Sequence, residues 1–137
     1  WLDACEHKYI EEVGTMNVFF VIDGEVVTPE LNGSILAGVT RDSTINLLKS
    51  WGVKVTERKL SIEELYEAHK AGKLDEAFGT GTAAVISPIG ALYDLDNNVT
   101  YDYGMKVGET CKKMYDHLQG IQYGRVEDTH NWNVLVE

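Results

Sequence analysis

The pattern of hydrophobic and polar positions changes along the chain and predicts a mixture of strands and helices. Val18–Ile22 is a continuous apolar run, which is typical of a strand buried on both faces. Asp23-Gly24 follows as a strong hairpin signal, so Glu25–Thr28 is the expected return strand and Pro29 ends it. Val53–Leu60 alternates between apolar and polar residues and predicts a further strand.

Two segments in the first half carry the spacing and end signals of helices. Apolar residues between Ile45 and Trp51 recur at helical intervals, and Gly52 is the expected stop. Ser61-Ile-Glu-Glu64 has the pattern of a capping box, which predicts a second helix that ends near Gly72.

The second half predicts short strands, a hairpin at Asp94–Asn98 and a last helix that begins at Gly108 and closes at Gly120 or Gly124. Gly79–Ala84 is expected as a loop. The apolar face of the last helix is expected to consist of Cys111, Met114, Tyr115 and Leu118. Further short extended segments are expected at Trp1–Asp3, Lys8–Glu12, Leu74–Phe78, Val85–Pro88, Ala91–Tyr93 and Val99–Tyr103. Together these elements predict a single mixed α/β (α+β) domain over residues 1–137.

Composition narrows the classes of partner. The net charge of −10 argues against nucleic acid or an anionic membrane surface as the main partner, although backbone donors can still bind an anion locally. No apolar run approaches the ~18 residues of a membrane span. Cys5 and Cys111 fit no metal or redox spacing, and the four histidines show no metal spacing either, so no metal site is expected.

Two loops carry the strongest signal for chemistry. Ser34–Ser43 reads as a loop that runs into a helix, where Gly38 allows close approach and Val39 and Thr40 offer free N–H groups. Such a helix start binds anions, because the unpaired donors and the helix dipole point the same way. Gly79–Ala84 has the same small, hydroxyl-rich character. We therefore expect the two loops to share a phosphate or carboxylate ligand.

The acidic pair Glu11 and Glu12 lies just before a Gly-Thr-Met break and has two interpretations. Both side chains could be solvated at the surface. Alternatively, one carboxylate could face a cationic ring nitrogen, whose pKa it would raise so that the ring stays protonated. An electron-sink cofactor requires that protonation.

Three motifs together resemble one protein family. In order and spacing they resemble the C-terminal half of branched-chain amino acid aminotransferases, which are fold-type IV (class IV) pyridoxal-phosphate enzymes. The three motifs are Glu12–Asn17, Pro29–Arg41 and Phe78–Ala84. The resemblance continues through Ile121–Gly124 and Thr129–Trp132. It implies the C-terminal cofactor-binding domain of the D-amino acid aminotransferase-like fold, with strands in a pseudo-barrel and flanking helices.

The resemblance also implies roles for individual residues. Glu12 matches the acid that pairs with the pyridine nitrogen of pyridoxal phosphate, and Leu36 matches the residue that contacts a face of its ring. The phosphate would be held by Val39, Thr40 and Thr82, with Gly38 allowing close approach. Without the family, Leu36 could be a plain core leucine, Thr40 an N-cap, and Thr80 and Thr82 ordinary strand-end threonines. The residues implied on the substrate side are Ala83, whose N–H would face the carboxylate, and Thr15 and Met16.

The lysine that forms the Schiff base in this family matches no lysine of the chain, and it is expected upstream of Trp1. The sequence therefore predicts a fragment without a catalytic residue, inactive alone, that lacks the N-terminal domain and its phosphate-binding arginine. Arg41 is expected to have a structural or surface role. Ala84 and Ser87 stand where some relatives carry a redox Cys-x-x-Cys, so no thiol switch is expected.

The parent protein implied by the resemblance transfers the amino group of leucine, isoleucine or valine to 2-oxoglutarate in amino-acid biosynthesis, as a cytoplasmic homodimer. Two alternatives stay open. The parent could be a D-amino acid aminotransferase or an aminodeoxychorismate lyase, because half of the substrate pocket is not in the chain. Alternatively, the chain could be a non-catalytic domain that binds an anion.

Overall fold

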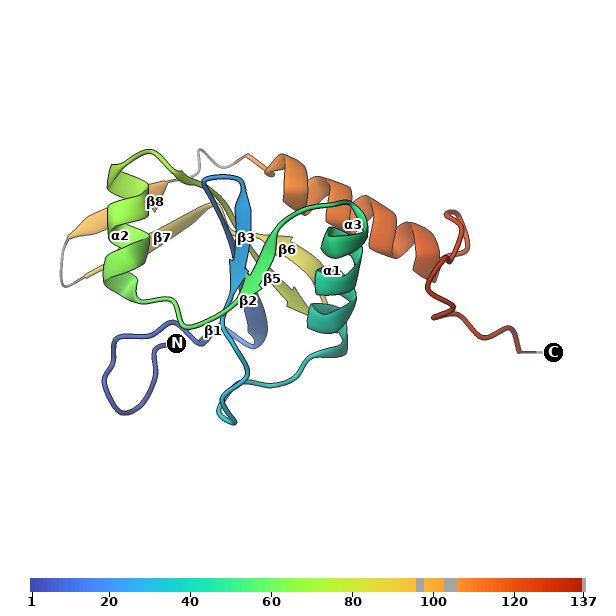
Figure 1. Ribbon diagram of the computed structural model, residues 1–137, viewed down its shortest axis with the longest axis horizontal. Helices are drawn as coiled ribbons and strands as arrows, with labels where there is room; N and C mark the ends of the chain where they lie inside the picture. The colour runs from blue at the N-terminus through green and yellow to red at the C-terminus, as the bar shows by residue number, and fades with distance from the viewer. Residues whose placement is uncertain (96–97, 103–105, 137) are drawn as a thin grey trace.

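A computed structural model describes residues 1–95, 98–102 and 106–136 (Figure 1). These residues form a six-stranded sheet, a two-stranded sheet and three helices, so the predicted mixed α/β class is confirmed. Residues 96, 97 and 103, which the hairpin prediction includes, lie outside the described residues. The strands are β1 (Glu12–Val13), β2 (Met16–Ile22), β3 (Glu25–Thr28), β4 (Val55–Glu57), β5 (Leu74–Gly81), β6 (Val85–Pro88), β7 (Ala91–Asp94) and β8 (Val99–Asp102). The helices are α1 (Val39–Ser50), α2 (Ile62–Lys70) and α3 (Glu109–Gln122).

The central strand of the large sheet is β2, the apolar run identified in the sequence. The strand order is β4-β3-β2-β5-β6, with β1 also paired to β2. β2 is antiparallel to β1, β3 and β5, whereas β3 and β4 are parallel. The predicted burial on both faces is confirmed, because Phe19 packs in one apolar cluster and Phe20 in another. Burying each phenyl side chain contributes about 1.5–3 kcal/mol to folding.

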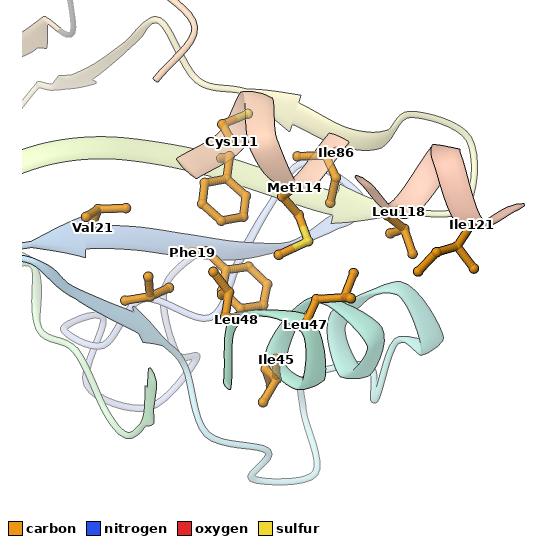
Figure 2. Close-up of a cluster of buried hydrophobic side chains, with 12 residues drawn as sticks. Phe19, Val21, Ile45, Leu47, Leu48, Ile86, Cys111, Met114, Leu118 and Ile121 are labelled. Atoms are coloured by element: carbon orange, nitrogen blue, oxygen red, sulfur yellow. The ribbon is translucent and has the colours of Figure 1, made fainter. Parts of the chain in front are cut away.

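One face of the sheet is covered by α1 and α3 (Figures 1 and 2). Phe19 stacks on Phe78 of β5 with the ring centroids 5.2 Å apart. Leu48 of α1 and Met114 of α3 pack in the same cluster, and both are fully buried. The cluster fixes α1 against the sheet, and with it the loop that leads into α1.

The other face is covered by α2 and the β7–β8 hairpin. The predicted start of α2 is confirmed, because the Ser61 hydroxyl accepts a hydrogen bond of 3.1 Å from the Glu64 backbone N–H. The carboxylate of Glu64 pairs with the Arg58 guanidinium instead of returning to the cap. None of the helices in the described ranges is long and apolar enough to cross a membrane.

The start of α3 is capped from a different element. Its N-cap is Gly108, which has no side chain for this purpose. Glu76 of β5 supplies the acceptor, since its carboxylate accepts from the backbone N–H groups of Thr110 at 2.9 Å and Cys111 at 3.0 Å. A Cβ atom at Gly108 would lie 2.0 Å from the Glu76 carboxyl carbon, so only glycine admits this approach.

Three local predictions were wrong. Gly79–Ala84 is not a loop throughout, because β5 pairs with β2 as far as Thr80 and with β6 as far as Gly81, and only residues 82–84 form a turn. Within Val53–Leu60 only the three residues of β4 form a strand, because only these three pair with β3. Tyr115 is 41% exposed, because the buried side of α3 follows a narrower stripe through Met114 and Leu118.

Candidate functional site

A small cavity of about 120 Å³ lies where the start of α1 meets β1, β2 and the end of β5. The structure brings together at this cavity seven of the nine residues implied as cofactor or substrate contacts. The remaining lining residues are Asn17, Thr80 and Gly81. The seven residues are Glu12, Thr15, Leu36, Gly38, Val39, Thr40 and Thr82.

A row of three polar side chains crosses the sheet along one side of the cavity. The strand register places Glu12 opposite Asn17, and Asn17 opposite Thr80. Directly opposed residues of neighbouring strands point to the same face of a sheet. The ends of this cross-strand row, Glu12 and Thr80, are therefore two strand spacings apart, about 10 Å.

The row holds the loop that carries Leu36. The Leu36 backbone N–H donates to Glu12 Oε1 at 3.1 Å, and Asn17 Nδ2 donates to the Leu36 carbonyl oxygen at 2.8 Å. Both polar groups of one residue are thus bound by side chains of the row. The Leu36 side chain remains 72% exposed, so its interpretation as a plain core leucine is wrong.

Glu11 reinforces the same loop further along. Its Oε1 atom accepts hydrogen bonds from the Ser34 hydroxyl at 2.5 Å and from Asn32 Nδ2 at 3.2 Å. The interpretation of Glu11 and Glu12 as a merely solvated acidic pair is therefore wrong, because each carboxylate binds a different part of the loop that precedes α1.

The start of α1 presents backbone donors to the cavity. Gly38 is the N-cap, with φ −68° and ψ 135° and no side-chain cap, so the interpretation of Thr40 as the N-cap is wrong. The N–H groups of the first turn have no acceptor within a helix, and the helix dipole adds partial positive charge there. Val39 and Thr40 line the cavity at this end. An anion can therefore be bound by backbone groups without a basic side chain.

The close contact between Asn17 and the start of α1 needs a glycine at position 38. A Cβ atom at this position would lie 2.3 Å from Asn17 Oδ1, far inside ordinary contact distance. The absence of a side chain at Gly38 thus lets the Asn17 amide lie against the beginning of α1. This finding agrees with the close approach predicted from the sequence.

Arg41 has a structural role, which is one of the two roles predicted for it from the sequence. Its side chain is 5% exposed, and one guanidinium nitrogen donates to the Pro29 carbonyl oxygen and to Glu57 Oε2, each at 2.9 Å. The alternative of a surface role is wrong. Arg41 does not line the cavity and instead ties α1 to the end of β3 and to β4.

The structure does not bring Met16 and Ala83 to the cavity. The Met16 side chain lies over Gly79 and Gly81 of β5, where added Cβ atoms would meet it at 2.9 and 3.2 Å. Ala83 lies in the exposed turn that follows Thr82. Both residues are neighbours in sequence of residues that line the cavity.

No site role was assigned to Asn17 or Thr80 from the sequence, although both fall within its motifs and both line the cavity. Each is a buried polar residue within a largely apolar strand. That combination is the signal that could have identified them, since buried polar groups normally have a specific partner.

The cavity can bind a ligand with a positive and a negative end. Its lining includes the acidic residue Glu12 as well as Thr82 and the first-turn residues Val39 and Thr40, whose backbone N–H groups have no acceptor within the helix. Among the described residues, no group of three or more histidine, cysteine, aspartate or glutamate side chains is arranged to hold a metal ion.

Comparison with known proteins gives a consistent family. Residues 5–92 match the family model described as amino-transferase class IV. The chain is 58% identical over 136 residues to branched-chain-amino-acid aminotransferase 2 of Bacillus subtilis, covering 99% of this chain and 37% of that protein. It is 44% identical to the branched-chain-amino-acid aminotransferase of Mycolicibacterium smegmatis, covering 96% of this chain and 37% of that protein.

Solved structures give the same result. The branched-chain amino acid aminotransferase of Escherichia coli aligns with a TM-score of 0.75 and 35% identity over 96% of this chain and 40% of that one. An aminotransferase from Brucella abortus bound to its cofactor PLP (pyridoxal phosphate) aligns with a TM-score of 0.61 and 37% identity, over 78% of this chain and 34% of that one. The chain thus spans well under half the length of the proteins it matches.

Proposed function

Because the chain belongs to the class IV amino-transferase family, we propose that it is the cofactor-binding part of a pyridoxal-phosphate-dependent branched-chain aminotransferase. The whole protein would move the amino group of leucine, isoleucine or valine to 2-oxoglutarate. The relatives named above support this substrate class. The observation that carries the proposal is the cavity itself, which gathers Glu12, Leu36 and the start of α1 around one space.

The residues of the cavity fit pyridoxal phosphate. When bound, this cofactor supplies an electron sink for chemistry at the α-carbon of an amino acid. Glu12 uses Oε1 to hold the Leu36 backbone N–H. Its carboxylate charge then raises the pKa of the ring nitrogen, which keeps the ring protonated. The exposed Leu36 side chain contacts one face of the ring, and the loop bonds to Glu12 and Asn17 hold it there.

The anionic end of the cofactor would lie at the start of α1. The Val39 and Thr40 backbone N–H groups and Thr82 hold the phosphate, and Gly38 permits the approach. Backbone donors suit this task in an acidic chain, because they bind a dianion without adding positive charge. On the substrate side, the Ala83 N–H would face the carboxylate, with Thr15 and Met16 nearby.

No lysine of this chain lines the cavity. We therefore assign no catalytic residue here and propose that the lysine that holds the cofactor, and an arginine for its phosphate, come from the part of the whole protein that this chain does not span. The lysine would then act as the proton shuttle at the substrate α-carbon. The whole protein is proposed to be a cytoplasmic homodimer.

The test is an amino-transfer assay with the whole protein and pyridoxal phosphate. We expect glutamate to form from 2-oxoglutarate when L-leucine, L-isoleucine or L-valine is supplied, and the 137-residue chain alone to show no turnover. Glu12→Gln should lower turnover strongly, because a neutral amide does not keep the ring nitrogen protonated.

Two outcomes would contradict this proposal. Use of D-alanine in place of the branched-chain L-amino acids would favour a D-amino acid aminotransferase. Turnover by the 137-residue chain alone would contradict the assignment of the lysine to another part of the protein.

A further inference from the structure

One buried hydroxyl group in the cavity has no hydrogen-bond partner. Thr80 on β5 is 1% exposed, and within the described residues its Oγ1 atom has neither a donor nor an acceptor in reach. Only two other buried side-chain atoms in the described ranges share this condition, Arg41 Nε and the Tyr101 hydroxyl, and neither residue lines this cavity. A buried polar group left without a partner costs about 1–3 kcal/mol, so a partner is expected from outside the chain.

The position of Thr80 indicates which part of a ligand it meets. Thr80 is the end of the cross-strand row farthest from Glu12. The other two members of the row already hold Leu36, through Glu12 Oε1 and Asn17 Nδ2. Thr80 is the member of the row whose side chain makes no hydrogen bond within the described residues, and it lies two residues before Thr82 at the same cavity.

The start of α1 lies beside the middle of the row, where Gly38 approaches Asn17, and it brings hydrogen-bond donors to the cavity that Thr80 lines. Val39 and Thr40 line the cavity at the first turn of α1, where backbone N–H groups lack partners within the helix. A threonine hydroxyl can donate one hydrogen bond, and donors gathered around one space favour an anionic oxygen. An uncharged ring edge would offer the threonine hydroxyl a much weaker hydrogen-bond acceptor than an anionic oxygen does.

We propose that Thr80 is a further cofactor-holding residue, whose Oγ1 donates a hydrogen bond to an oxygen of the cofactor phosphate. This inference rests on the function proposed above and adds a specific consequence. Thr80 helps the protein to select the phosphorylated form of the cofactor over the same ring without phosphate, because only the phosphorylated form supplies an anionic phosphate oxygen as the acceptor.

The test compares two ligands in three variants of the whole protein, freed of cofactor. The dissociation constants of pyridoxal 5′-phosphate and of pyridoxal are measured for the unchanged protein, Thr80→Val and Thr80→Ser. We expect Thr80→Val to weaken binding of the phosphorylated ligand by about tenfold to a hundredfold, as for loss of a hydrogen bond to a charged group. Binding of pyridoxal should not change, and Thr80→Ser should restore most of the preference.

A matched control separates this role from a structural one. Thr28 is also a fully buried strand threonine, but its hydroxyl donates to the Val18 carbonyl oxygen at 2.8 Å and it does not line the cavity. Thr28→Val should lower the unfolding temperature without changing the ratio of the two dissociation constants. Thr80→Val should not lower the unfolding temperature of the cofactor-free protein, because no hydrogen bond is lost there.

The proposal is overturned if Thr80→Val leaves the ratio unchanged, or if it weakens both ligands equally. A different result would overturn the proposed function as well: an unchanged protein that binds pyridoxal as tightly as pyridoxal 5′-phosphate has no phosphate site at the start of α1. The two failures are therefore distinguishable in one experiment.

Discussion

Replacing Gly38 by alanine tests whether the cavity depends on the contact between Asn17 and the start of α1. The added Cβ atom would lie 2.3 Å from Asn17 Oδ1, whereas its next contacts, Arg41 Cβ and Asn17 Cγ, are at an ordinary 3.5 Å. Carbon and oxygen atoms without a bond between them approach to roughly 3.5 Å, so the amide or the helix start must shift by about 1 Å.

The energy of this shift can be estimated from its parts. Forcing an extra methyl group into a packed site costs about 1–3 kcal/mol. Moving the Asn17 amide also weakens its bond to the Leu36 carbonyl oxygen, which contributes about 0.5–1.5 kcal/mol. The restriction of the unfolded chain by alanine offsets about 0.4–1 kcal/mol, since φ of −68° suits alanine. We expect Gly38→Ala to lower the free energy of unfolding by about 2 kcal/mol.

Urea unfolding of the whole protein measures this change, and a double-mutant cycle with Asn17→Ala identifies its cause. Truncating Asn17 removes the obstacle, so Gly38→Ala should cost less in that background, with a coupling energy of at least about 1 kcal/mol. The reasoning is refuted if Gly38→Ala is neutral in the unchanged protein, or if the two substitutions add within about 0.5 kcal/mol.

Three other measurements check separate parts of the structure. Glu76→Ala should lower the free energy of unfolding by about 1–2 kcal/mol in urea titrations, because the N–H groups of Thr110 and Cys111 lose their acceptor; a neutral result would exclude a capping role. Burial, with a smaller effect of Glu76, raises the pKa of Cys111 to about 11, so a thiol reagent at pH 8 should modify exposed Cys5 and leave Cys111 unmodified until the protein unfolds. Backbone hydrogen bonds, the largest from Tyr9 N–H, hold the pKa of Asp3 well below its ordinary value. The stabilisation from Asp3 is therefore complete when the pH is above that ordinary value, and it is lost as pH falls toward the lowered pKa. Asp3→Asn should flatten the acid limb of a curve of stability against pH, and an unchanged limb would contradict this role.

Much of the fold could be predicted because local signals agreed with long-range packing. The apolar run of β2 and the Ser61 cap of α2 formed as expected. The end of β5 could not be predicted from local signals, because Gly79 and Gly81 have low strand propensity; Gly79 is extended by pairing with both β2 and β6, and Gly81 by pairing with β6. Tyr115 was assigned to the wrong face since apolar spacing alone does not define the width of a buried stripe.

The candidate site was predictable to a similar extent. The motifs led to Glu12, Leu36 and Thr40, and the structure brings all three to one cavity. Asn17 and Thr80 escaped notice because their importance depends on strand register, which places them in a row with Glu12. The register of β2 and β5 is set by pairing between residues far apart in the sequence, such as Asn17 and Thr80, and no local pattern specifies it.

The hydrogen bonds that Glu12 and Asn17 make with the backbone N–H and carbonyl of Leu36 have a consequence for how related proteins can vary. The Leu36 N–H and the Leu36 carbonyl belong to the two peptide groups on either side of its Cα, so neither group can rotate without breaking a hydrogen bond, and Glu12 and Asn17 together fix the direction of the Leu36 side chain. Alanine at position 38 would avoid a shift of the amide or the helix start only with a residue smaller than asparagine at position 17. A family member that has lost this amide is therefore expected to hold the ring of its cofactor by a different loop geometry.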